Sequence, residues 1–335
     1  MTDKILLDHG SGGKVAHQLT TDVLMPVFDN PILASLHDGA VFELDSGRLA
    51  FSTDTFVVDP IFFPGGDIGD LAVNGTVNDV AMCGAVPRYL SMGLILEEGF
   101  PMADLKRILQ SMRRAMDRAG VQLVTGDTKV VPRGAADKIF INTSGIGTLI
   151  PGLAIDSNQA RPGDVVLLSG TMADHGIAVM TQREGLRFAS SVQSDTAPLH
   201  GMVQRMVSGT RDIHVLRDPT RGGVGTALNE IAEQSNVGIV LHEEKLPVKP
   251  EVQGICELLG FDPLYLANEG KLLCIVPECQ AQTVLEAMRA DDFGRQACLI
   301  GEIVAENPGR VVMQTTIGGR RIVDMLAGEQ LPRIC

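Results

Sequence analysis

Three aspartates give the first chemical signal in this sequence. Asp54, Asp79 and Asp127 each stand at the end of an apolar run, Asp54 and Asp127 at the ends or edges of expected strands and Asp79 on an expected helix. Magnesium prefers hard oxygen ligands, usually one or two carboxylates together with water and nucleotide phosphates. Singly, Asp54 is as simply a turn residue and Asp79 a helix-surface charge. Together, the three predict a site for Mg²⁺ and ATP.

A glycine-rich loop supplies a second element of such a site. Gly10, Ser11, Gly12 and Gly13 precede a helix-like stretch, so their backbone N–H groups are placed to bind phosphate as a helix N-terminus does. The loop lacks the Gly-x-x-x-x-Gly-Lys-Ser/Thr pattern of a Walker loop. Alone, it is also typical of a plain flexible loop. Lys129, two residues after Asp127, is expected to contact phosphate or developing negative charge, the alternative being a solvated lysine.

The last five residues are Leu-Pro-Arg-Ile-Cys, ending at Cys335. A thiol is nucleophilic once ionised and can carry a covalently attached group. Because chain termini are usually mobile, we expect a flexible arm from Met325 onward and do not expect Cys335 to be part of a core. The alternative is an exposed cysteine with no role.

Composition narrows the class of protein. The chain has 335 residues, 44% of them hydrophobic, and a formal net charge of −13, which opposes binding to nucleic acid. No signal peptide or membrane span is recognisable, and no Cys-x-x-Cys pair or zinc-type Cys/His spacing is present. These features predict a two-domain α/β enzyme in a reducing cytoplasm.

Strands and helices alternate through both halves of the chain, as in layered α/β domains. We expect the two halves to meet at 151–163 and irregular structure from Met325 onward. The expected strands are 49–58, 89–96, 121–125, 139–148, 165–169, 238–241, 271–276 and 298–304, and the expected helices are 68–81, 102–119, 173–183, 198–207, 225–235, 252–259 and 281–290. The loop at 218–223 is either a second anion cradle or only a turn. His175 is expected to start a helix rather than bind a ligand. Glu269 precedes an apolar strand, where it is either a base or a surface charge.

Taken together, the motifs resemble the HypE family of hydrogenase maturation proteins, within the superfamily of aminoimidazole ribonucleotide synthetase and selenophosphate synthetase. The similarity runs from end to end of the chain. Its motifs are His-Gly-Ser-Gly-Gly ending at Gly13, Ser-Thr-Asp at Asp54, Asn78-Asp79-Val-Ala, Gly-Asp-Thr-Lys at 126–129, Asp-Pro-Thr-Arg-Gly-Gly at 218–223, Asn-Glu-Gly-Lys at 268–271 and the terminal Pro-Arg-Ile-Cys. The last of these is the most specific, because the superfamily shares the others.

The resemblance implies ATP-dependent dehydration of a carbamoyl group on Cys335 to a thiocyanate. In that scheme Asp54, Asp79 and Asp127 hold Mg²⁺, while the nucleotide contacts come from Gly10, Ser11, Gly12, Gly13, Asn78, Thr128 and Lys129. Lys129 also stabilises charge at the transferred group, and Glu269 accepts a proton from the amide. The arm must fold in for chemistry and out for delivery.

The resemblance also implies partners and an architecture: a HypF-type carbamoyltransferase, a HypC–HypD scaffold and a homodimer, with no nucleic acid and no membrane. The expected fold is a mixed α+β or α/β two-domain synthetase, with segments at 1–40 (glycine loop), 41–150 (nucleotide and dimer domain), 151–305 (α/β domain) and 306–335 (terminal strands and mobile tail). The alternatives are a selenophosphate- or purine-pathway synthetase acting on a free molecule, and a non-catalytic thiol carrier. No cysteine precedes Cys83, whereas selenophosphate synthetases carry Cys or selenocysteine in the first glycine loop.

Overall fold

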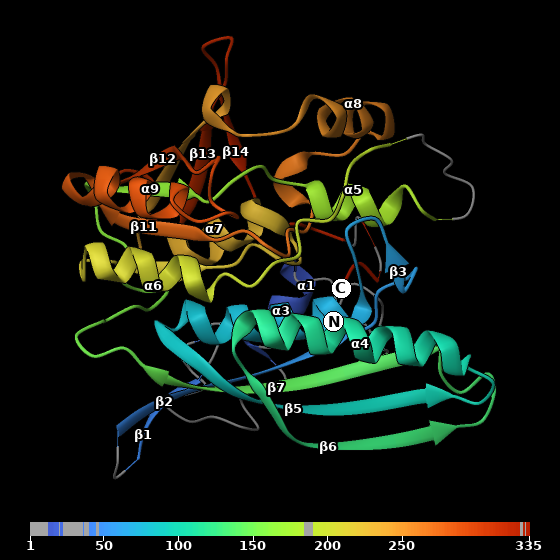
Figure 1. The fold of residues 1–335 in the computed structure, drawn as a ribbon. Helices are drawn as coiled ribbons and strands as arrows, with labels where there is room; N and C mark the ends of the chain where they lie inside the picture. Colours follow the sequence, from blue (N-terminus) through green and yellow to red (C-terminus); the bar gives the residue numbers. More distant parts are fainter. Residues whose placement is uncertain are drawn as a thin grey trace.

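The computed structural model describes residues 13–19, 21–22, 36, 40–44, 47–183, 190–328, 331 and 333–335. The chain folds into two halves stacked on each other, the N-terminal half below and the C-terminal half above in Figure 1. Gly10, Ser11 and Gly12 lie outside the described residues. Among the residues described, no helix has both the length and the apolarity needed to cross a bilayer.

The N-terminal half is built on a mixed sheet, as expected. In the described part of the chain its strands lie in the order β1-β2-β7-β5-β6, with β5 and β6 parallel and the other neighbours antiparallel. These strands are β1 (Ala40–Leu44), β2 (Gly47–Phe56), β7 (Ile139–Leu149), β5 (Ala85–Glu97) and β6 (Gln122–Val131). A short pair, β3 (Phe62–Phe63) and β4 (Gly66–Asp67), leads into the first long helix.

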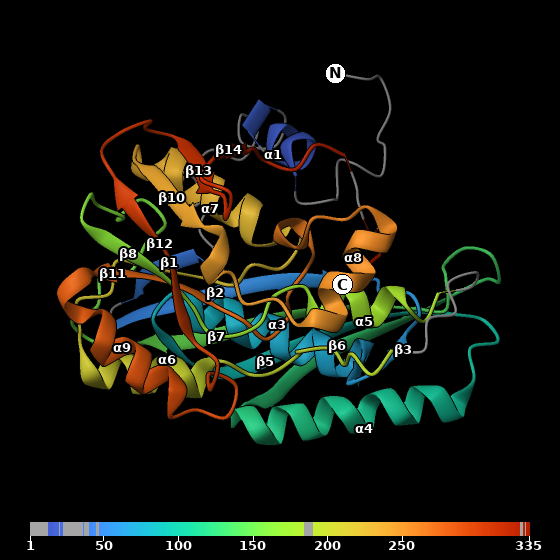
Figure 2. The ribbon, with the colours of Figure 1, turned by 90° about the horizontal axis from the view of Figure 1, so that it is seen from above.

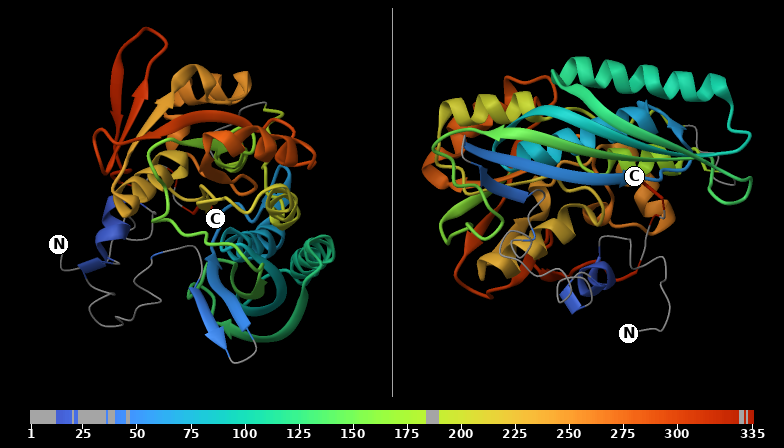
Figure 3. Two further views of the ribbon diagram at one scale, coloured as in Figure 1. Left: turned by 90° about the vertical axis from the view of Figure 1, so that its left-hand side faces the viewer. Right: turned by 90° about the horizontal axis from the view of Figure 1, so that it is seen from below.

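Two helices cover one face of this sheet, α3 (Ile68–Met82) and α4 (Met102–Ala119). The α3 helix packs tightly on β7 because Gly147 has no side chain; a Cβ there would lie 2.4 Å from Val80 Cγ1. The α4 helix follows Pro101 and ends at Gly120, which has the left-handed conformation of a helix C-cap, so its expected bounds are confirmed. No helix covers the opposite face of the sheet in the described residues, and Figure 3 (right) shows that face from below.

The C-terminal half holds a second, larger sheet. Its described strands lie in the order β14-β13-β10-β12-β8-β11-β9. They are β14 (Arg320–Val323), β13 (Arg310–Gln314), β10 (Gly238–His242), β12 (Cys298–Val304), β8 (Asp164–Leu168), β11 (Leu273–Pro277) and β9 (Val215–Arg217). The helices of this half are α5 (Asp174–Met180), α6 (His200–Gly209), α7 (Gly223–Ser235), α8 (Pro250–Leu259) and α9 (Ala281–Arg289), and a short α1 (Lys14–Leu19) follows the glycine loop. Figure 2, from above, shows how these helices surround the sheet.

Alternation along β8 explains why this sheet is buried on both faces. Val166 and Leu168 join the apolar cluster that contains α7, whereas Val165 and Leu167 join the cluster of α6 and α9. Successive side chains of a strand point to opposite faces, so an all-apolar strand indicates a sheet covered on both sides. The second cluster also contains Met82 at the end of α3, which joins the two halves through a shared core.

Several expected boundaries were wrong, mostly in strands. The strand expected at 121–125 continues to Val131, the one expected at 89–96 begins at Ala85, and β9 was not expected. The Gly-Asp-Thr segment inside β6 resembles a loop locally, but main-chain pairing with β5 keeps it extended. From Met325 onward the described residues contain no helix or strand, as expected.

Candidate active site

The expectation that Cys335 lies outside any core was wrong. Cys335 is only 7% exposed and Ile334 only 5%, and both belong to the apolar cluster of the N-terminal half. The same cluster includes Val179 on α5 and Ala267 before β11. The carboxyl end therefore lies between the two halves, as Figures 1 and 3 show. The flexible arm expected from the sequence is, in this structure, docked.

Main-chain hydrogen bonds hold the docked tail against the segment that follows β2. The N–H of Val57 donates to the main-chain oxygen of Cys335 at 2.9 Å, and the N–H of Asp59 donates to that of Arg333 at 3.1 Å. The Arg333 side chain donates through Nε to the Val57 oxygen at 2.9 Å and forms an ion pair with Asp137. The tail thus pairs with 57–59 much as an added strand would, which compensates the desolvation of its polar backbone.

Ionisable side chains surround the docked thiol. Arg221, from the loop that leads into α7, lies 3.9 Å from Asp54 on β2. The Cys335 sulfur, in its ionised form, raises the pKa of Arg221 most, and the carboxylates of Asp54, Glu269 and Asp79 raise it further. Arg221 therefore stays charged and is the cation at the centre of this cluster.

Two groups in the cluster have strongly perturbed acidity. Burial raises the pKa of the Cys335 thiol to about 12, although Arg221 opposes the shift. Burial also raises the pKa of the Glu269 carboxyl well above its usual range, with Asp54 and Asp218 adding to the effect. Glu269 is 3% exposed and its Oε1 has no hydrogen-bond partner. A desolvated carboxylate with a raised pKa and a free oxygen is suited to accept a proton near neutral pH.

Asp79 lies next to Asp54 on the same side of the sheet. The Ser52 hydroxyl on β2 donates to Asp79 Oδ2 on α3 at 2.6 Å. Ser52 and Asp54 are two residues apart on one strand and so share a face. A Cβ built on Gly75, one turn before Asp79 on α3, would lie 3.7 Å from Asp54 Oδ2. The structure therefore brings Asp54 and Asp79 together with Glu269 and Cys335.

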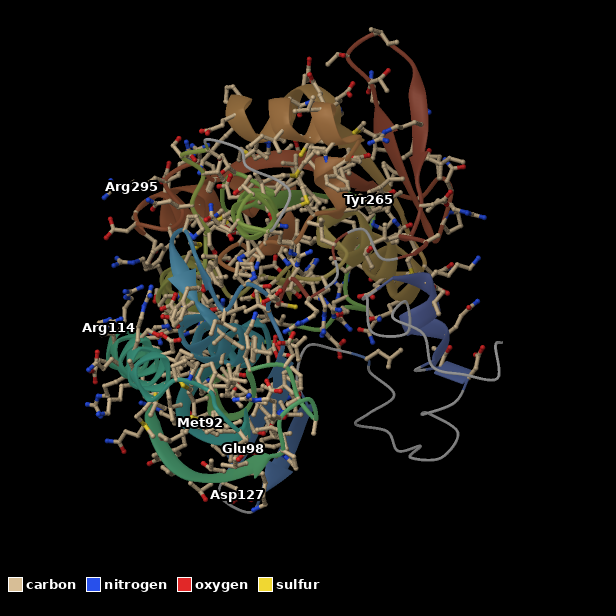
Figure 4. The ribbon with its side chains drawn as sticks, turned by 90° about the vertical axis from the view of Figure 1, so that its right-hand side faces the viewer. Met92, Glu98, Arg114, Asp127, Tyr265 and Arg295 are labelled. Carbon is tan, nitrogen blue, oxygen red and sulfur yellow. The ribbon has the colours of Figure 1, made fainter. Side chains whose placement is uncertain are left out.

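Asp127 and Lys129 lie elsewhere. Asp127 is in line with Gly93 on β5, then Asn142 on β7 and Thr55 on β2, so three strand spacings, roughly 14 Å, separate its strand from β2. It shares a face with Thr55 and therefore points away from the face on which Asp54 lies. Its carboxylate pairs with Lys129 Nζ at 2.8 Å, and both side chains are largely exposed. Figure 4 shows Asp127 at the outer, lower side of the sheet, far from the helices.

The remaining expected nucleotide-binding residues are placed as follows. Thr128 lies on β6 beside Asp127, to whose Oδ1 its N–H donates at 2.8 Å. Gly13 packs against Leu326, where a Cβ would lie 2.3 Å from the carbonyl oxygen. Asn78 is fully buried, and its amide hydrogen-bonds to the oxygens of Ala197 and Glu269 and to the N–H of Leu199. Asn78 therefore holds the main chain of Glu269 in place through hydrogen bonds within this chain.

The carboxylates present fit a magnesium ion that takes few protein ligands. No group of three or more potential metal ligands is preassembled among the described residues. Asp54 and Asp79, however, supply two neighbouring hard oxygen donors, which is the number Mg²⁺ commonly takes from protein when phosphates and water complete its shell.

Sequence reasoning gave no role to two residues that the structure places beside the tail, Arg221 and His175. Arg221 stands in the quoted motif at 218–223, but an isolated arginine beside a turn carries no signal of its own. His175 is near the start of α5, as expected, yet it is fully buried and its Nε2 lies 2.8 Å from the Ile334 oxygen. Neither contact is local in sequence, so only the folded chain reveals them.

Comparison with known proteins decides the family. The chain matches the family models "AIR synthase related protein, N-terminal domain" over residues 36–149 and "AIR synthase related protein, C-terminal domain" over residues 161–314. It is 54% identical to the carbamoyl dehydratase HypE of Azotobacter vinelandii, covering 98% of this chain and 96% of that relative.

The chain belongs to the HypE family of carbamoyl dehydratases.

Two crystal structures of HypE relatives have the same fold. A HypE–HypF complex aligns with a TM-score of 0.88 and 49% identity, covering 92% of this chain and 99% of that one. A HypE in complex with ATP aligns with a TM-score of 0.84 and 54% identity, covering 99% and 100%.

Proposed function

We propose that this chain uses ATP to dehydrate a carbamoyl group carried on the Cys335 sulfur, giving a thiocyanate that supplies cyanide to the iron of nickel–iron hydrogenases. The observation that carries the proposal is the docking of Cys335 beside Glu269 and Arg221. The HypE relatives are named carbamoyl dehydratases, and one of them was crystallised with ATP.

The thiol must be loaded while the tail is undocked. In the docked position its raised pKa, about 12, keeps the sulfur of Cys335 protonated, and a protonated thiol is a poor nucleophile. Once carbamoylated, the sulfur has no proton to lose, so docking the product of that transfer leaves no buried thiolate. Loading outside and dehydration inside are thus separated by the burial of one atom.

Dehydration then needs the amide oxygen to become a leaving group. The thiocarbamate oxygen attacks the γ-phosphorus of ATP, an O–P bond forms, and ADP departs. Glu269 accepts a proton from the nitrogen, the C–O bond breaks with loss of phosphate, and loss of the second N–H proton completes the C≡N bond. Arg221 is placed to stabilise negative charge on the transferred group, so positioning and charge neutralisation carry most of the catalysis.

Asp54 and Asp79 would hold magnesium from this chain. Bound Mg²⁺ would supply neutralisation of triphosphate charge. Burial raises the pKa of the Asp54 carboxyl, and Arg221 lowers it. A nearby cation would favour the ionised form of Asp54 for the same reason that Arg221 does.

The open face of the N-terminal sheet supports a homodimer. A row of apolar side chains crosses it, Phe51, Ile146 and Tyr89, each between 38% and 48% exposed. Ile95 on β5, which pairs with Lys129, lies on the same face and is 43% exposed. Contiguous exposed apolar surface marks an interaction site, so we assign this face to a second copy of the chain.

Such pairing would also give Asp127 and Lys129 a role. Both side chains lie on the open face of the sheet, on its edge strand β6. A second copy of the chain packed on this face would therefore contact Asp127 and Lys129. We propose that Asp127, Thr128 and Lys129 contact nucleotide and Mg²⁺ across the interface, together with Gly10, Ser11, Gly12 and Gly13.

The partners follow from the family and the chemistry. We propose a HypF-type carbamoyltransferase as the source of the carbamoyl group, as in the HypE–HypF complex, and a HypC–HypD scaffold as the recipient of cyanide. The six cysteines, all among the described residues, are free thiols, which agrees with a reducing cytoplasm.

The docked tail also weighs against the alternatives. A synthetase acting on a free small molecule has no use for a thiol placed among Glu269, Arg221 and Asp54. A passive thiol carrier has no use for a desolvated carboxylate with an unsatisfied oxygen beside its cargo, since burying one is costly.

Intact-mass spectrometry tests the proposal. Protein incubated with the carbamoyl donor system should gain one carbamoyl group on Cys335 and then lose about one water mass when ATP is added, as expected for phosphoryl-assisted dehydration. A Cys335→Ala variant should gain nothing. Retention of the full carbamoyl mass in the presence of ATP and Mg²⁺ contradicts the proposal.

A further inference from the structure

The last three residues of the tail, 333–335, each have a main-chain oxygen that accepts a hydrogen bond from elsewhere in the chain. Four donors serve the three oxygens: Asp59 N–H and Arg183 Nη2 serve Arg333, at 3.1 and 3.0 Å, His175 Nε2 serves Ile334 at 2.8 Å, and Val57 N–H serves Cys335 at 2.9 Å. Two of these donors are backbone groups, and Arg183 shares its acceptor with one of them. Within the described residues, His175 is therefore the one side chain that serves a tail oxygen alone.

The hydrogen bonds of His175 fix its tautomer. The Ile334 oxygen can only accept, so Nε2 carries the proton. Nδ1 is then the acceptor, and it receives the hydroxyl of Ser194 at 2.8 Å. Ser194 Oγ in turn accepts from the N–H of Thr196 at 3.2 Å. The result is a directed chain from the Thr196 N–H through Ser194 and the imidazole to the tail.

The ring has no room to turn out of this chain. His175 is fully buried, and Phe63 packs edge-on against it with 5.4 Å between ring centroids. Burial also lowers the pKa of His175, which keeps the ring neutral as the hydrogen bonds require. A side chain held on both nitrogens and on its face is a rigid reference point for whatever it binds.

We infer that His175 is a positioning residue, which through the Ile334 oxygen sets both the fraction of tail that is docked and the place of the Cys335 sulfur during dehydration. Only the statement about the Cys335 sulfur during dehydration rests on the proposed function. Docking itself is measurable without any dehydration.

Two substitutions separate the hydrogen bond from the packing. His175→Gln keeps one amide N–H for Ile334 and one oxygen for Ser194, whereas His175→Leu keeps a similar volume and removes both functions. The first readout is alkylation of Cys335 by iodoacetamide, quantified by peptide mass spectrometry, with the exposed Cys279 as the reference within the same molecule.

Loss of one net hydrogen bond corresponds to about a fivefold to tenfold change in the docking equilibrium. His175→Leu should therefore raise the alkylation rate of Cys335 by about that factor, while Cys279 is unchanged. His175→Gln should stay within about twofold of the wild type. Equal rates for the wild type and His175→Leu overturn the inference, as does a rate for His175→Gln equal to that of His175→Leu.

The second readout uses protein already carbamoylated on Cys335. At saturating ATP, His175→Leu should lose water about fivefold to tenfold more slowly with the KM for ATP unchanged, and His175→Gln should restore the rate. If His175→Leu does not fold, Ser194→Ala replaces it; that variant removes only the acceptor-side partner and should show about a threefold effect in the same directions. No effect of Ser194→Ala then overturns the inference. A wild-type protein that never loses water defeats the proposed function and leaves the alkylation result standing.

Discussion

The region around Cys335 and the region around Asp127 differ in a way that the sequence motifs conceal. The first is assembled from both halves of one chain and is largely buried, with Glu269 at 3% and Cys335 at 7% exposure. The second lies on an edge strand, where the side chains of Asp127 and Lys129 are 73% and 70% exposed. Both belong to motifs through which the sequence resembles the family, at 126–129 and at the carboxyl terminus.

The difference teaches that one chain assembles all of the described residues around the thiol of Cys335. It assembles only part of the residues expected to bind nucleotide, because Asp127 and Lys129 lie apart. Glu269 and Arg221 already have their neighbours, and their acidity is already perturbed by burial and charge. Asp127, by contrast, has its pKa lowered only by local contacts, chiefly the hydrogen bond from Lys129. An exposed ion pair of this kind contributes little to the stability of the fold. A role for Asp127 and Lys129 must therefore come from a molecule that binds there.

Glu269→Gln should produce the largest effect on the reaction, and this effect should be confined to the dehydration of the group on Cys335. Removing a general base typically slows its step about 10²- to 10⁴-fold. We expect ATP-dependent water loss from carbamoylated protein to fall by that factor while carbamoyl loading of Cys335 is unchanged, both followed by intact mass. Glu257→Gln, an exposed glutamate on α8, is the matched control. A Glu269→Gln protein that dehydrates at the wild-type rate removes Glu269 from the mechanism.

Ile146→Lys should break the contact between copies. Ile146 stands in the middle of the open sheet face and is 39% exposed, so a lysine is tolerated in a lone chain. Two like charges facing each other in an interface cost several kcal/mol, so the dimer dissociation constant should rise about 100-fold or more, as measured by sedimentation. Leu258→Lys, on exposed α8, controls for added charge. Unchanged association places the interface elsewhere.

Lys129→Met should weaken nucleotide binding with no effect on the tail. A hydrogen bond to a charged group is worth about 1.5–3 kcal/mol, so ATP affinity measured by calorimetry should fall about tenfold or more, while Cys335 alkylation without ATP stays the same. Arg113→Met, which removes another exposed cation paired with an aspartate, serves as the control. If ATP affinity is the same in Lys129→Met and wild-type dimers, the exposed region takes no part in the site.

The smallest effect concerns pH. The docked Cys335 thiol has its pKa raised to about 12, so the docked state binds the proton more tightly than the free tail does. Docking is therefore fully favoured below the pKa of a free thiol, about 8.5, and weakens as pH rises from there through the docked value. The thiolate absorbance lost on Cys335→Ser substitution should titrate well above that of an exposed cysteine. An ordinary titration of Cys335 would show that the thiol is not held in the pocket.

Sequence patterns predict local structure here better than assembly. Pro101 and Gly120 bracket α4 because each acts on its own turn of backbone. Asp54, Asp79 and Asp127 were expected to converge on one metal site, and of these the structure brings Asp54 and Asp79 together, near Glu269. The separation of Asp127 was not expected, since it depends on β7 and β5 lying between β2 and β6, and strand order is set by long-range pairing. The burial of Cys335 was not expected for the same reason, because its partners are Val57 and residues far along the chain.

The contact between Lys14 and Leu326 sets a limit on delivery. The N–H of Lys14 donates to the Leu326 oxygen at 2.8 Å, so this hydrogen bond fixes the tail to α1 at that residue. The residues beyond Leu326, when fully stretched, reach roughly 30 Å. Any acceptor of the cyanide must bring its iron within that distance of Leu326. The distance that the Cys335 sulfur can reach therefore depends on the number of residues after Leu326, and deleting or inserting residues there should shorten or lengthen it.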